Sequence, residues 1–197
     1  MRPLLLLLFS PLTSIITICA CRTTTTTTTT LTAIATVTSP SPCSPTSPPL
    51  PLGTAHVRNH CSFPLHLWSV ANDMSGPFPL ASRTGHYAER FRTDPVSHGI
   101  SLKIARGGRG ALDNGEAHTV FGYNLDGGFR GRRWWGGWSV WYDLSDVHGD
   151  LFRGKKVALE SKDGRCERIV WADGVAPRGN LTTVCDAGRD LVLTLCA

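Results

Sequence analysis

The sequence predicts an all-β domain, an antiparallel β-sandwich closed by two disulfide bonds. Three observations support this prediction. Short runs of apolar residues alternate with polar ones, residues typical of turns separate these runs, and four cysteines lie in the region from residue 53 onward, in a chain that begins with a predicted secretory signal. No stretch keeps an apolar stripe at helical spacing for three turns, so helices are not expected.

The chain of 197 residues begins with a predicted signal peptide, residues 1–21. Arg2 supplies the positive start, and residues 4–9 are apolar without interruption. An uncleaved anchor is the alternative, but no stretch reaches the roughly 20 apolar residues that a membrane-spanning helix needs. The sequence therefore indicates a secreted protein, extracellular or associated with a cell wall.

Residues 22–52 are predicted to form a disordered stalk that is rich in Thr, Ser and Pro. Residues 23–30 are all threonine, and residues 39–51 contain six prolines and four serines. Such a segment cannot bury apolar surface, and its composition is typical of a plain linker or of an O-glycosylated stalk. Asn180 begins an Asn-Leu-Thr sequon and is a candidate N-glycosylation site.

Residues 53–197 are predicted to form the folded domain, with strands that follow from period-two patterns. Turn-forming residues are expected at 113–115, 126–128, 163–164 and 187–188. The expected apolar strand faces are Cys61, Phe63, Leu65 and Leu67, with His66 and Trp68 opposite; Ile100, Leu102 and Ile104; Thr119, Phe121, Tyr123 and Leu125; Val140, Tyr142 and Leu144; and Leu191, Leu193 and Leu195.

An oxidising compartment favours disulfide bonds among Cys61, Cys166, Cys185 and Cys196. Of the three possible pairings, we expect Cys61–Cys196 with Cys166–Cys185, because the first bridge would join the opening and closing strands. Loop entropy alone would contribute about 3 kcal/mol for the shorter loop and about 5 kcal/mol for the longer one. Cys43 is then free or paired outside the domain. A zinc site is the alternative, but no close C-x-x-C pair is present.

Seven segments carry a resemblance to a known family, and together they cover essentially residues 53–197. They are VRNHCSF at 57–63, LWSV at 67–70, DPVS at 94–97, TVF at 119–121, VWYDLSDV at 140–147, IVW at 169–171 and LTLC at 193–196. These segments resemble thaumatin-like proteins, and most closely the fungal Blastomyces yeast-phase-specific protein family. The resemblance implies a thaumatin-like sandwich, paired first and last cysteines, and a cell-wall or extracellular setting.

Larger thaumatin-like proteins carry an acidic cleft that has been linked to β-1,3-glucan binding and weak hydrolysis. That cleft uses an Arg, a Glu and three Asp. By the resemblance, Asp143 matches the first aspartate, whereas Gly122 and His148 stand where the glutamate and the next acid are expected. The arginine and the third aspartate have no match here. The resemblance therefore does not supply a catalytic site.

Asp143, Asp146 and Asp150 are the only local carboxylate cluster. Glycoside hydrolysis needs two carboxyl groups that face each other, roughly 5 Å apart for retention or about 6.5–9.5 Å for inversion. All three aspartates follow one strand and no opposing wall is identified, so turn formation is the simpler interpretation. The histidines, including His56 and His60, are interpreted as surface residues. No nucleotide, cofactor or metal motif is found.

Residues 127–138, GGFRGRRWWGGW, are interpreted as an insertion at the tip of a hairpin. Arginine beside tryptophan suits stacking on sugars, an anionic lipid surface or a polyanion, and a loop without a role is the alternative. Secretion argues against RNA as a partner. The candidate ligand-contact residues are Arg130, Arg132, Arg133, Trp134, Trp135 and Trp138 in this segment and Trp141 and Asp143 beyond it.

The sequence thus predicts a secreted, non-enzymatic protein. Its expected partners are β-glucan or another cell-wall polysaccharide, or an extracellular protein of a host or competitor. A weak β-1,3-glucanase and a membrane-active antimicrobial protein that acts through the Arg/Trp segment are the alternatives. No catalytic residue, cofactor, metal, nucleic-acid partner or transmembrane segment is predicted.

Overall fold

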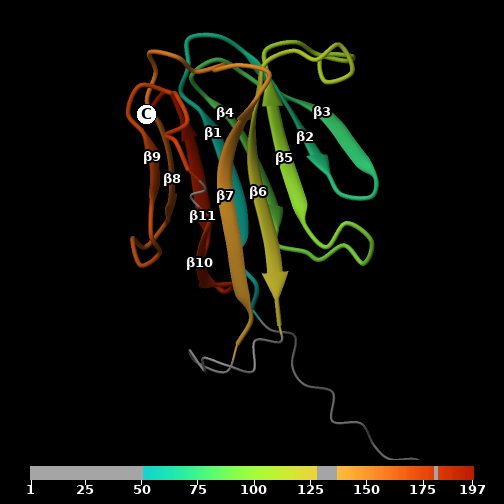
Figure 1. Cartoon of the computed structure of the whole chain (residues 1–197), viewed down its shortest axis with the longest axis vertical. Helices are drawn as coiled ribbons and strands as arrows, with labels where there is room; N and C mark the ends of the chain where they lie inside the picture. Colours follow the sequence, from blue (N-terminus) through green and yellow to red (C-terminus); the bar gives the residue numbers. More distant parts are fainter. Residues whose placement is uncertain (1–50, 128–136, 180–181) are drawn as a thin grey trace, which may run out of the picture. The chain divides into compact units, whose positions relative to one another are not determined.

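The computed structural model describes residues 51–127, 137–179 and 182–197, which form two packed β-sheets (Figure 1). Sheet A has the strand order β4-β1-β11-β8-β9, and sheet B has the order β10-β7-β6-β5-β2-β3. The strands are β1 (Thr54–Asn59), β2 (Leu65–Val70), β3 (Met74–Leu80), β4 (Gly85–Arg90), β5 (Ile100–Ala105), β6 (His118–Asp126), β7 (Ser139–Val147), β8 (Val157–Ser161), β9 (Ile169–Trp171), β10 (Thr183–Asp186) and β11 (Leu191–Leu195).

The predicted all-β class is confirmed. Figure 1 shows β5, β6 and β7 of sheet B in front of β1 and β4 of sheet A. Every strand pairing in the described ranges is antiparallel except that of β1 with β11, which is parallel. Over those same ranges, no helix is long and apolar enough to cross a membrane.

Both predicted disulfide bonds are present. Cys61–Cys196 joins the residues that follow β1 and β11, and these two strands are neighbours in sheet A, as the pairing argument required. Cys166–Cys185 joins the loop before β9 of sheet A to β10 of sheet B. The short loop of the second bridge therefore holds the edges of the two sheets together, and the first bridge closes the chain on itself.

The core between the sheets consists of the apolar faces expected from the period-two patterns. In β11, Leu191, Leu193 and Leu195 are fully buried, and Ile104 of β5 and Phe121 of β6 meet the same core. Burying each such side chain stabilises the fold by roughly 1.5–3 kcal/mol. The alternating pattern thus fixes which side of each sheet faces its partner.

The structure corrects two details of the first predicted strand. Cys61 and Phe63 lie in the turn before β2, so they do not share a strand face with Leu65 and Leu67. Trp68 does lie opposite Leu67, but it is only 3% exposed because Ala105 and Ala111 cover it in a second, smaller cluster. The loop after β5 therefore closes part of the outer face of sheet B.

A polar network centred on Glu89 of β4 spans the two sheets. Ser69 Oγ and the Tyr87 hydroxyl donate hydrogen bonds to Glu89 Oε2 at 2.7 and 2.9 Å, and the Tyr123 hydroxyl donates to Oε1 at 2.5 Å. Arg92 Nη2 donates to Ser69 Oγ at 2.9 Å. Because Glu89 is 13% exposed, this network satisfies a nearly buried carboxylate and connects β4 of sheet A with β2 and β6 of sheet B.

Candidate functional site

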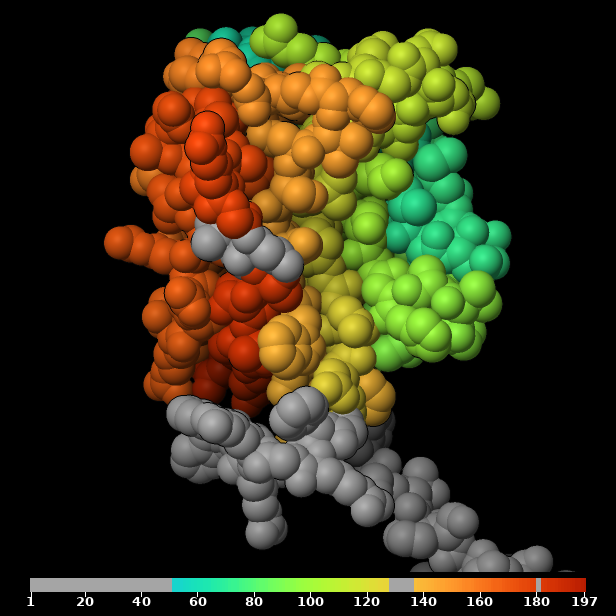
Figure 2. Space-filling view, viewed as in Figure 1, coloured from blue at the N-terminus to red at the C-terminus, as the bar shows by residue number. Residues whose placement is uncertain are grey.

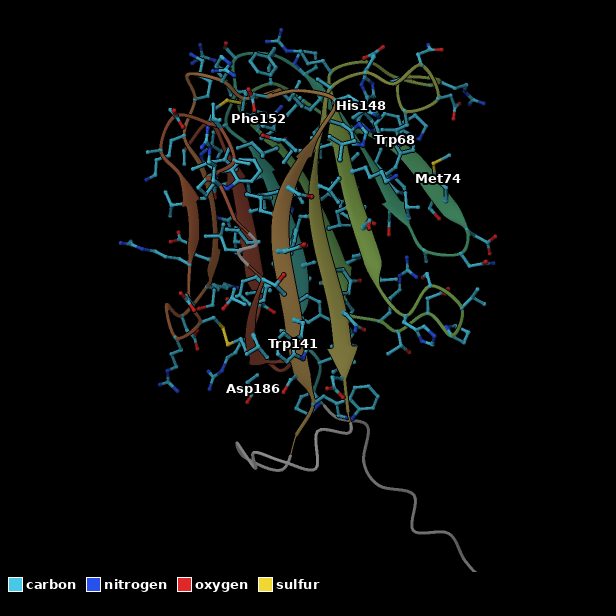
Figure 3. The ribbon with its side chains drawn as sticks, in the orientation of Figure 1. Trp68, Met74, Trp141, His148, Phe152 and Asp186 are labelled. Atoms are coloured by element: carbon cyan, nitrogen blue, oxygen red, sulfur yellow. A yellow bond between two sulfur atoms is a disulfide. The ribbon has the colours of Figure 1, made fainter. Side chains whose placement is uncertain are left out.

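The outer face of sheet B is where the structure places Trp141 and Asp143. On β7, Val140, Tyr142 and Leu144 are buried in the core, so the residues between them point away from it. Trp141 is 38% exposed, one of few large apolar side chains in the described ranges with that much exposure. Figure 3 shows it on β7, at the end of the strand remote from His148.

A row of paired residues crosses this face at Gly122. Gly122 of β6 pairs with Asp143 of β7 on one side and with Ser101 of β5 on the other. Because Gly122 has no side chain, the surface is hollowed there. A Cβ at Gly122 would lie 2.3 Å from Asp143 Oδ1, so the carboxylate of Asp143 occupies the space above the glycine.

This hollow is an open groove with a volume of about 490 Å³. We call it the Trp141 groove. Figure 2 shows the face of the molecule on which it lies, with the side chains of β5, β6 and β7 exposed to the viewer. The lining residues that matter for recognition are Ser101, Lys103, Gly122, Asn124, Trp141 and Asp143.

A second hollow lies on the other side of Trp141. It is lined by Asp94, His98, Asn124 and Asp126 among others. Asp94 Oδ1 accepts hydrogen bonds from the backbone N–H groups of Val96 and Ser97, which help to hold the pKa of Asp94 below its usual value. Asp94 therefore shapes the loop that forms one wall, and Trp141 stands between two shallow depressions.

Asp143 is the acidic side chain of the Trp141 groove. Burial raises its pKa, and a hydrogen bond from the Gly122 backbone opposes that rise. The Asp143 carboxyl group, beside an exposed indole, can accept hydrogen bonds from hydroxyl groups of a ligand. Asp126 faces the same side of β6, four residues from Gly122, which places it about 13 Å along the strand. That separation exceeds the roughly 9.5 Å limit for a pair of hydrolytic carboxylates.

The predicted cluster of Asp143, Asp146 and Asp150 does not form one rim. Asp146 lies three residues after Asp143 in the same strand, so the two side chains point to opposite faces of sheet B. Thr119, which is fully buried, donates a hydrogen bond to Asp146 Oδ1 at 2.7 Å. Asp150 lies beyond β7 and pairs with Arg153. The interpretation as turn residues was also wrong for Asp143 and Asp146, since both belong to β7.

The histidines pair in a way that sequence spacing did not reveal. His56 of β1 meets His86 of β4, with 3.1 Å between Nδ1 of the first and Nε2 of the second, whereas His60 lies beyond the end of β1. His118 is only 5% exposed, so its interpretation as a surface residue was wrong, and its ring centroid lies 5.9 Å from that of His148. The parts of the chain that the structure describes contain no group of three or more His, Cys, Asp or Glu that could hold a metal ion.

The Arg/Trp segment connects β6 to β7. The last pair of that hairpin joins Asp126 to Ser139, so the predicted position at a hairpin tip is confirmed. Trp138 is partly buried against the main core and lies beside Gly127, so it contributes to packing. The candidates Arg130, Arg132, Arg133, Trp134 and Trp135, the sequon residue Asn180, and Cys43 lie outside the described residues.

Sequence reasoning identified Trp141 and Asp143 but missed the residues that make them a groove. Asn124 and Ser101 lie on β6 and β5, and their role depends on strand register, which the alternating pattern does not give. Gly122 was noticed only as the loss of an acid. One signal was available, because a glycine inside an otherwise regular strand often marks a close approach.

Comparison with known proteins supports the resemblance found in the motifs. The family model of the Blastomyces yeast-phase-specific proteins matches residues 45–197. The antigenic thaumatin-like protein of Arthroderma benhamiae is 28% identical over 156 residues, covering 74% of this chain and 72% of the relative. The crystal structure of the protein elicitor MoHrip2 from Magnaporthe oryzae matches with a TM-score of 0.56 at 20% sequence identity. This match covers 74% of the present chain and 99% of the elicitor chain.

Proposed function

The chain belongs to the Blastomyces yeast-phase-specific protein family, and we propose that it is a secreted binding protein without enzyme activity. Its ligand-binding surface is the Trp141 groove, and its ligand is a neutral cell-wall polysaccharide of the β-glucan class. The observation that carries the proposal is the exposed ring of Trp141 beside a groove lined with amide, hydroxyl and carboxyl groups.

A sugar ring needs both kinds of surface. Its C–H groups form an apolar face that can stack on an indole, and its hydroxyls require hydrogen-bond partners around the edge. Trp141 offers the first, while Asn124, Ser101 and Asp143 offer the second on the neighbouring strands. The carboxylate of Asp143 occupies the space above Gly122, so it lies low in the groove, where a chain on the sheet can meet it. An open groove, rather than an enclosed pocket, suits a polymer.

The arrangement of acids supports binding without hydrolysis. Glycoside hydrolysis needs a proton donor and a second carboxyl group across the scissile bond. Asp143 has a raised pKa, but Gly122 stands directly opposite it and Asp146 points to the other side of the sheet. Asp94 is held by backbone hydrogen bonds with a lowered pKa, which makes it a poor proton donor.

Three observations support secretion. The first 21 residues have the charge and apolar pattern of a signal peptide. Two disulfide bonds form within the domain, and such bonds persist in oxidising compartments. A relative that is 28% identical carries the name antigenic thaumatin-like protein, and an antigen of this kind fits an extracellular position.

The binding test is a sedimentation assay with insoluble β-1,3-glucan. We expect Trp141→Ala to weaken binding at least about tenfold, since a central tryptophan often contributes 2 kcal/mol or more at an interface. Val170→Ala is the control, because Val170 is also exposed, at 36%, but lies on β9 of sheet A, away from the groove. Equal binding by wild type and Trp141→Ala would refute the assignment of the groove.

The catalytic test uses the same protein with soluble laminarin. We expect no release of reducing sugar above a boiled control, even at micromolar protein. Turnover that Asp143→Ala abolishes, in a variant that unfolds at the same urea concentration as wild type, would replace the binding proposal with a glucanase.

A further inference from the structure

The outer face of sheet A differs from that of sheet B in the groups it presents. In β1, Ala55, Val57 and Asn59 are fully buried, so His56 and Arg58 point outward. The register carries this face across β4, where His86 pairs with Arg58 and Arg90 pairs with Thr54. Apart from Ala88, which pairs with His56, the outward residues of β1 and β4 are polar or basic.

The same face continues over β8 and β9. Lys156 directly precedes Val157, the buried first residue of β8, and Arg168 directly precedes Ile169, the buried first residue of β9. Because side chains alternate along a strand, the exposed Lys156 and Arg168 point outward. Lys162 Nζ lies 3.7 Å from Asp190 Oδ2, and His56 Nε2 lies 3.7 Å from the same oxygen, which places Lys162 beside His56. We call this surface the basic face; its cations are Arg58, Arg90, Lys156, Lys162 and Arg168.

The basic face stands out because the described chain as a whole is balanced. Of the 20 Lys and Arg, five (Arg2, Arg22, Arg130, Arg132 and Arg133) lie outside the described ranges, so the fifteen that remain equal the 15 Asp and Glu. Five of these fifteen cations lie on the basic face, together with two acids, Glu160 and Asp190, and Glu167 lines a pocket with Lys156 and Arg168 at its edge. The face therefore has an excess of cations over acids.

Several of these cations are available to a ligand. Within the ranges that the structure describes, Arg58, Lys156 and Arg168 form no salt bridge. Asp190, one of the two acids, is already engaged, because its Oδ1 accepts a hydrogen bond from Thr54 N and its Oδ2 lies near His56 and Lys162. The net positive potential of the face is thus not cancelled internally.

From this geometry we propose that the basic face binds an acidic polysaccharide, a polymer that carries a carboxylate on most of its sugar units. Arg58 pairs with Thr194 of β11, and Thr194 pairs with Ala158 of β8, two residues from Lys156. Strands lie about 4.8 Å apart and rise about 3.4 Å per residue, so a chain that crosses β1, β11 and β8 obliquely meets Arg58 and Lys156 roughly 12 Å apart. Arginine can also bind a carboxylate through two parallel hydrogen bonds. A flat face with repeated cations fits an extended polyanion.

The composition of the face argues against two other anionic partners. A membrane surface would require large exposed apolar or aromatic side chains for insertion. Among the exposed large hydrophobic residues of the described ranges, only Val170, 36% exposed at β9, lies on this side. Single-stranded nucleic acid is held by stacking on aromatic rings. Tyr87 of β4 and Trp171 of β9 cannot stack on bases, because the Tyr87 hydroxyl donates a hydrogen bond to the nearly buried Glu89 and Trp171 is only 1% exposed.

The test measures binding of the full-length secreted protein to polygalacturonate at low and at high salt. We expect wild type to bind at low salt and to lose affinity as salt rises. The double variant Arg58→Glu/Lys156→Glu should bind about tenfold more weakly, since it reverses two exposed charges, each worth up to a few-fold. The matched control is Arg109→Glu/Arg178→Glu, which changes net charge equally in two loops and should stay within twofold of wild type.

Each alternative has a distinct result. An equal loss in both double variants would show attraction to net charge alone and would overturn the proposal. So would a loss confined to Arg130→Ser/Arg132→Ser/Arg133→Ser, or binding to phosphatidylserine vesicles or single-stranded DNA without binding to polygalacturonate. Trp141→Ala should leave polygalacturonate binding within twofold of wild type. The proposal for the Trp141 groove and the proposal for the basic face can therefore be refuted independently of each other.

Discussion

The two outer faces of this sandwich follow the same rule of alternation and present opposite chemistry. On sheet A, the outward positions of β1 and β4 include the basic residues His56, Arg58, His86 and Arg90. On sheet B, the corresponding positions of β5, β6 and β7 centre on a glycine and an exposed tryptophan. The inner faces cannot diverge in this way, because they share one close-packed core.

This difference shows that the fold leaves the two surfaces independent of each other. A β-sandwich constrains every second residue of a strand and leaves the others to solvent, so each face can acquire its own ligand. Under the two proposals above, the protein binds a neutral polymer on one side and an acidic polymer on the other. Changes on one face should leave the other unaffected, unless they act through the fold.

Glu89→Ala tests the connection between the faces and should have the largest effect. Removing this carboxylate leaves the hydroxyls of Tyr123, Tyr87 and Ser69 without their acceptor in a nearly buried site. We expect the free energy of unfolding to fall by about 3 kcal/mol. Urea unfolding measures this free energy. The affinities for β-1,3-glucan and for polygalacturonate should both be unchanged under conditions where the variant is still folded.

Glu160→Ala is the control for that prediction. Glu160 lies in β8 with its side chain exposed on the outer face of sheet A, so its removal should change stability by less than about 0.5 kcal/mol. A similar loss of stability in both variants would mean that the Glu89 network adds nothing specific. A selective loss of one binding activity in Glu89→Ala would mean that the network belongs to that face.

Sequence patterns were sufficient for the central strands and for the disulfide bonds. β5, β6, β7 and β11 alternate apolar and polar residues because one side of each is buried, and this produces a readable period. The strands at the sheet edges gave weaker signals. β3 contains two prolines and has one fully buried residue, Leu80, so neither composition nor burial imposes an alternating pattern there.

The candidate site was less predictable than the fold, because it depends on pairing between strands. Trp141 and Asp143 could be assigned to one face from their spacing alone. That Gly122 lies across from Asp143, and Ser101 beyond it, required the register of β5 and β6. The basic face was missed for the same reason, since its cations are scattered in sequence and converge only when β1 meets β4 and β11.

Gly122→Ala tests whether Asp143 must lie over the glycine for β-glucan to bind. The new Cβ would lie 2.3 Å from Asp143 Oδ1, so the carboxylate must rotate away, which it can do because it is the end of a side chain. We expect β-1,3-glucan binding to weaken about fivefold to tenfold, a change of roughly 1–1.4 kcal/mol. Binding to polygalacturonate should stay within twofold of wild type.

A double-mutant cycle separates this explanation from a general effect on the groove. If Gly122→Ala acts by moving Asp143, it should have little further effect in an Asp143→Ala background. Fully additive losses would show that the methyl group obstructs the ligand directly. Sedimentation with insoluble β-1,3-glucan gives all four affinities, and urea unfolding checks that each variant is folded.

Asp146 provides the smallest and most local test, because it shares β7 with Asp143 but faces inward. Burial is the main cause that raises its pKa to about 6, with Asp150 adding to the rise, while the hydrogen bond from Thr119 opposes it. Asp146 Oδ2 is buried without a hydrogen-bond partner among the described residues. In the unfolded chain an aspartate has a pKa of about 3.9.

A carboxyl group whose pKa is higher in the folded state destabilises the fold when it is ionised. The penalty is absent well below the unfolded pKa of about 3.9, where Asp146 is protonated in both states; it grows between about pH 4 and 6 and is complete well above pH 6. Asp146→Asn does not titrate, so the stability of wild type relative to this variant should fall as pH rises from 4 to 7.5. Because Asp146 is only half-buried, solvent screening reduces the change to about 1 kcal/mol.

Urea unfolding at each pH measures the difference, and an opposite slope would show that Asp146 is stabilised as an anion. Affinity for β-1,3-glucan should be the same in both proteins, since the side chain lies on the core side of sheet B and the Trp141 groove lies on the other.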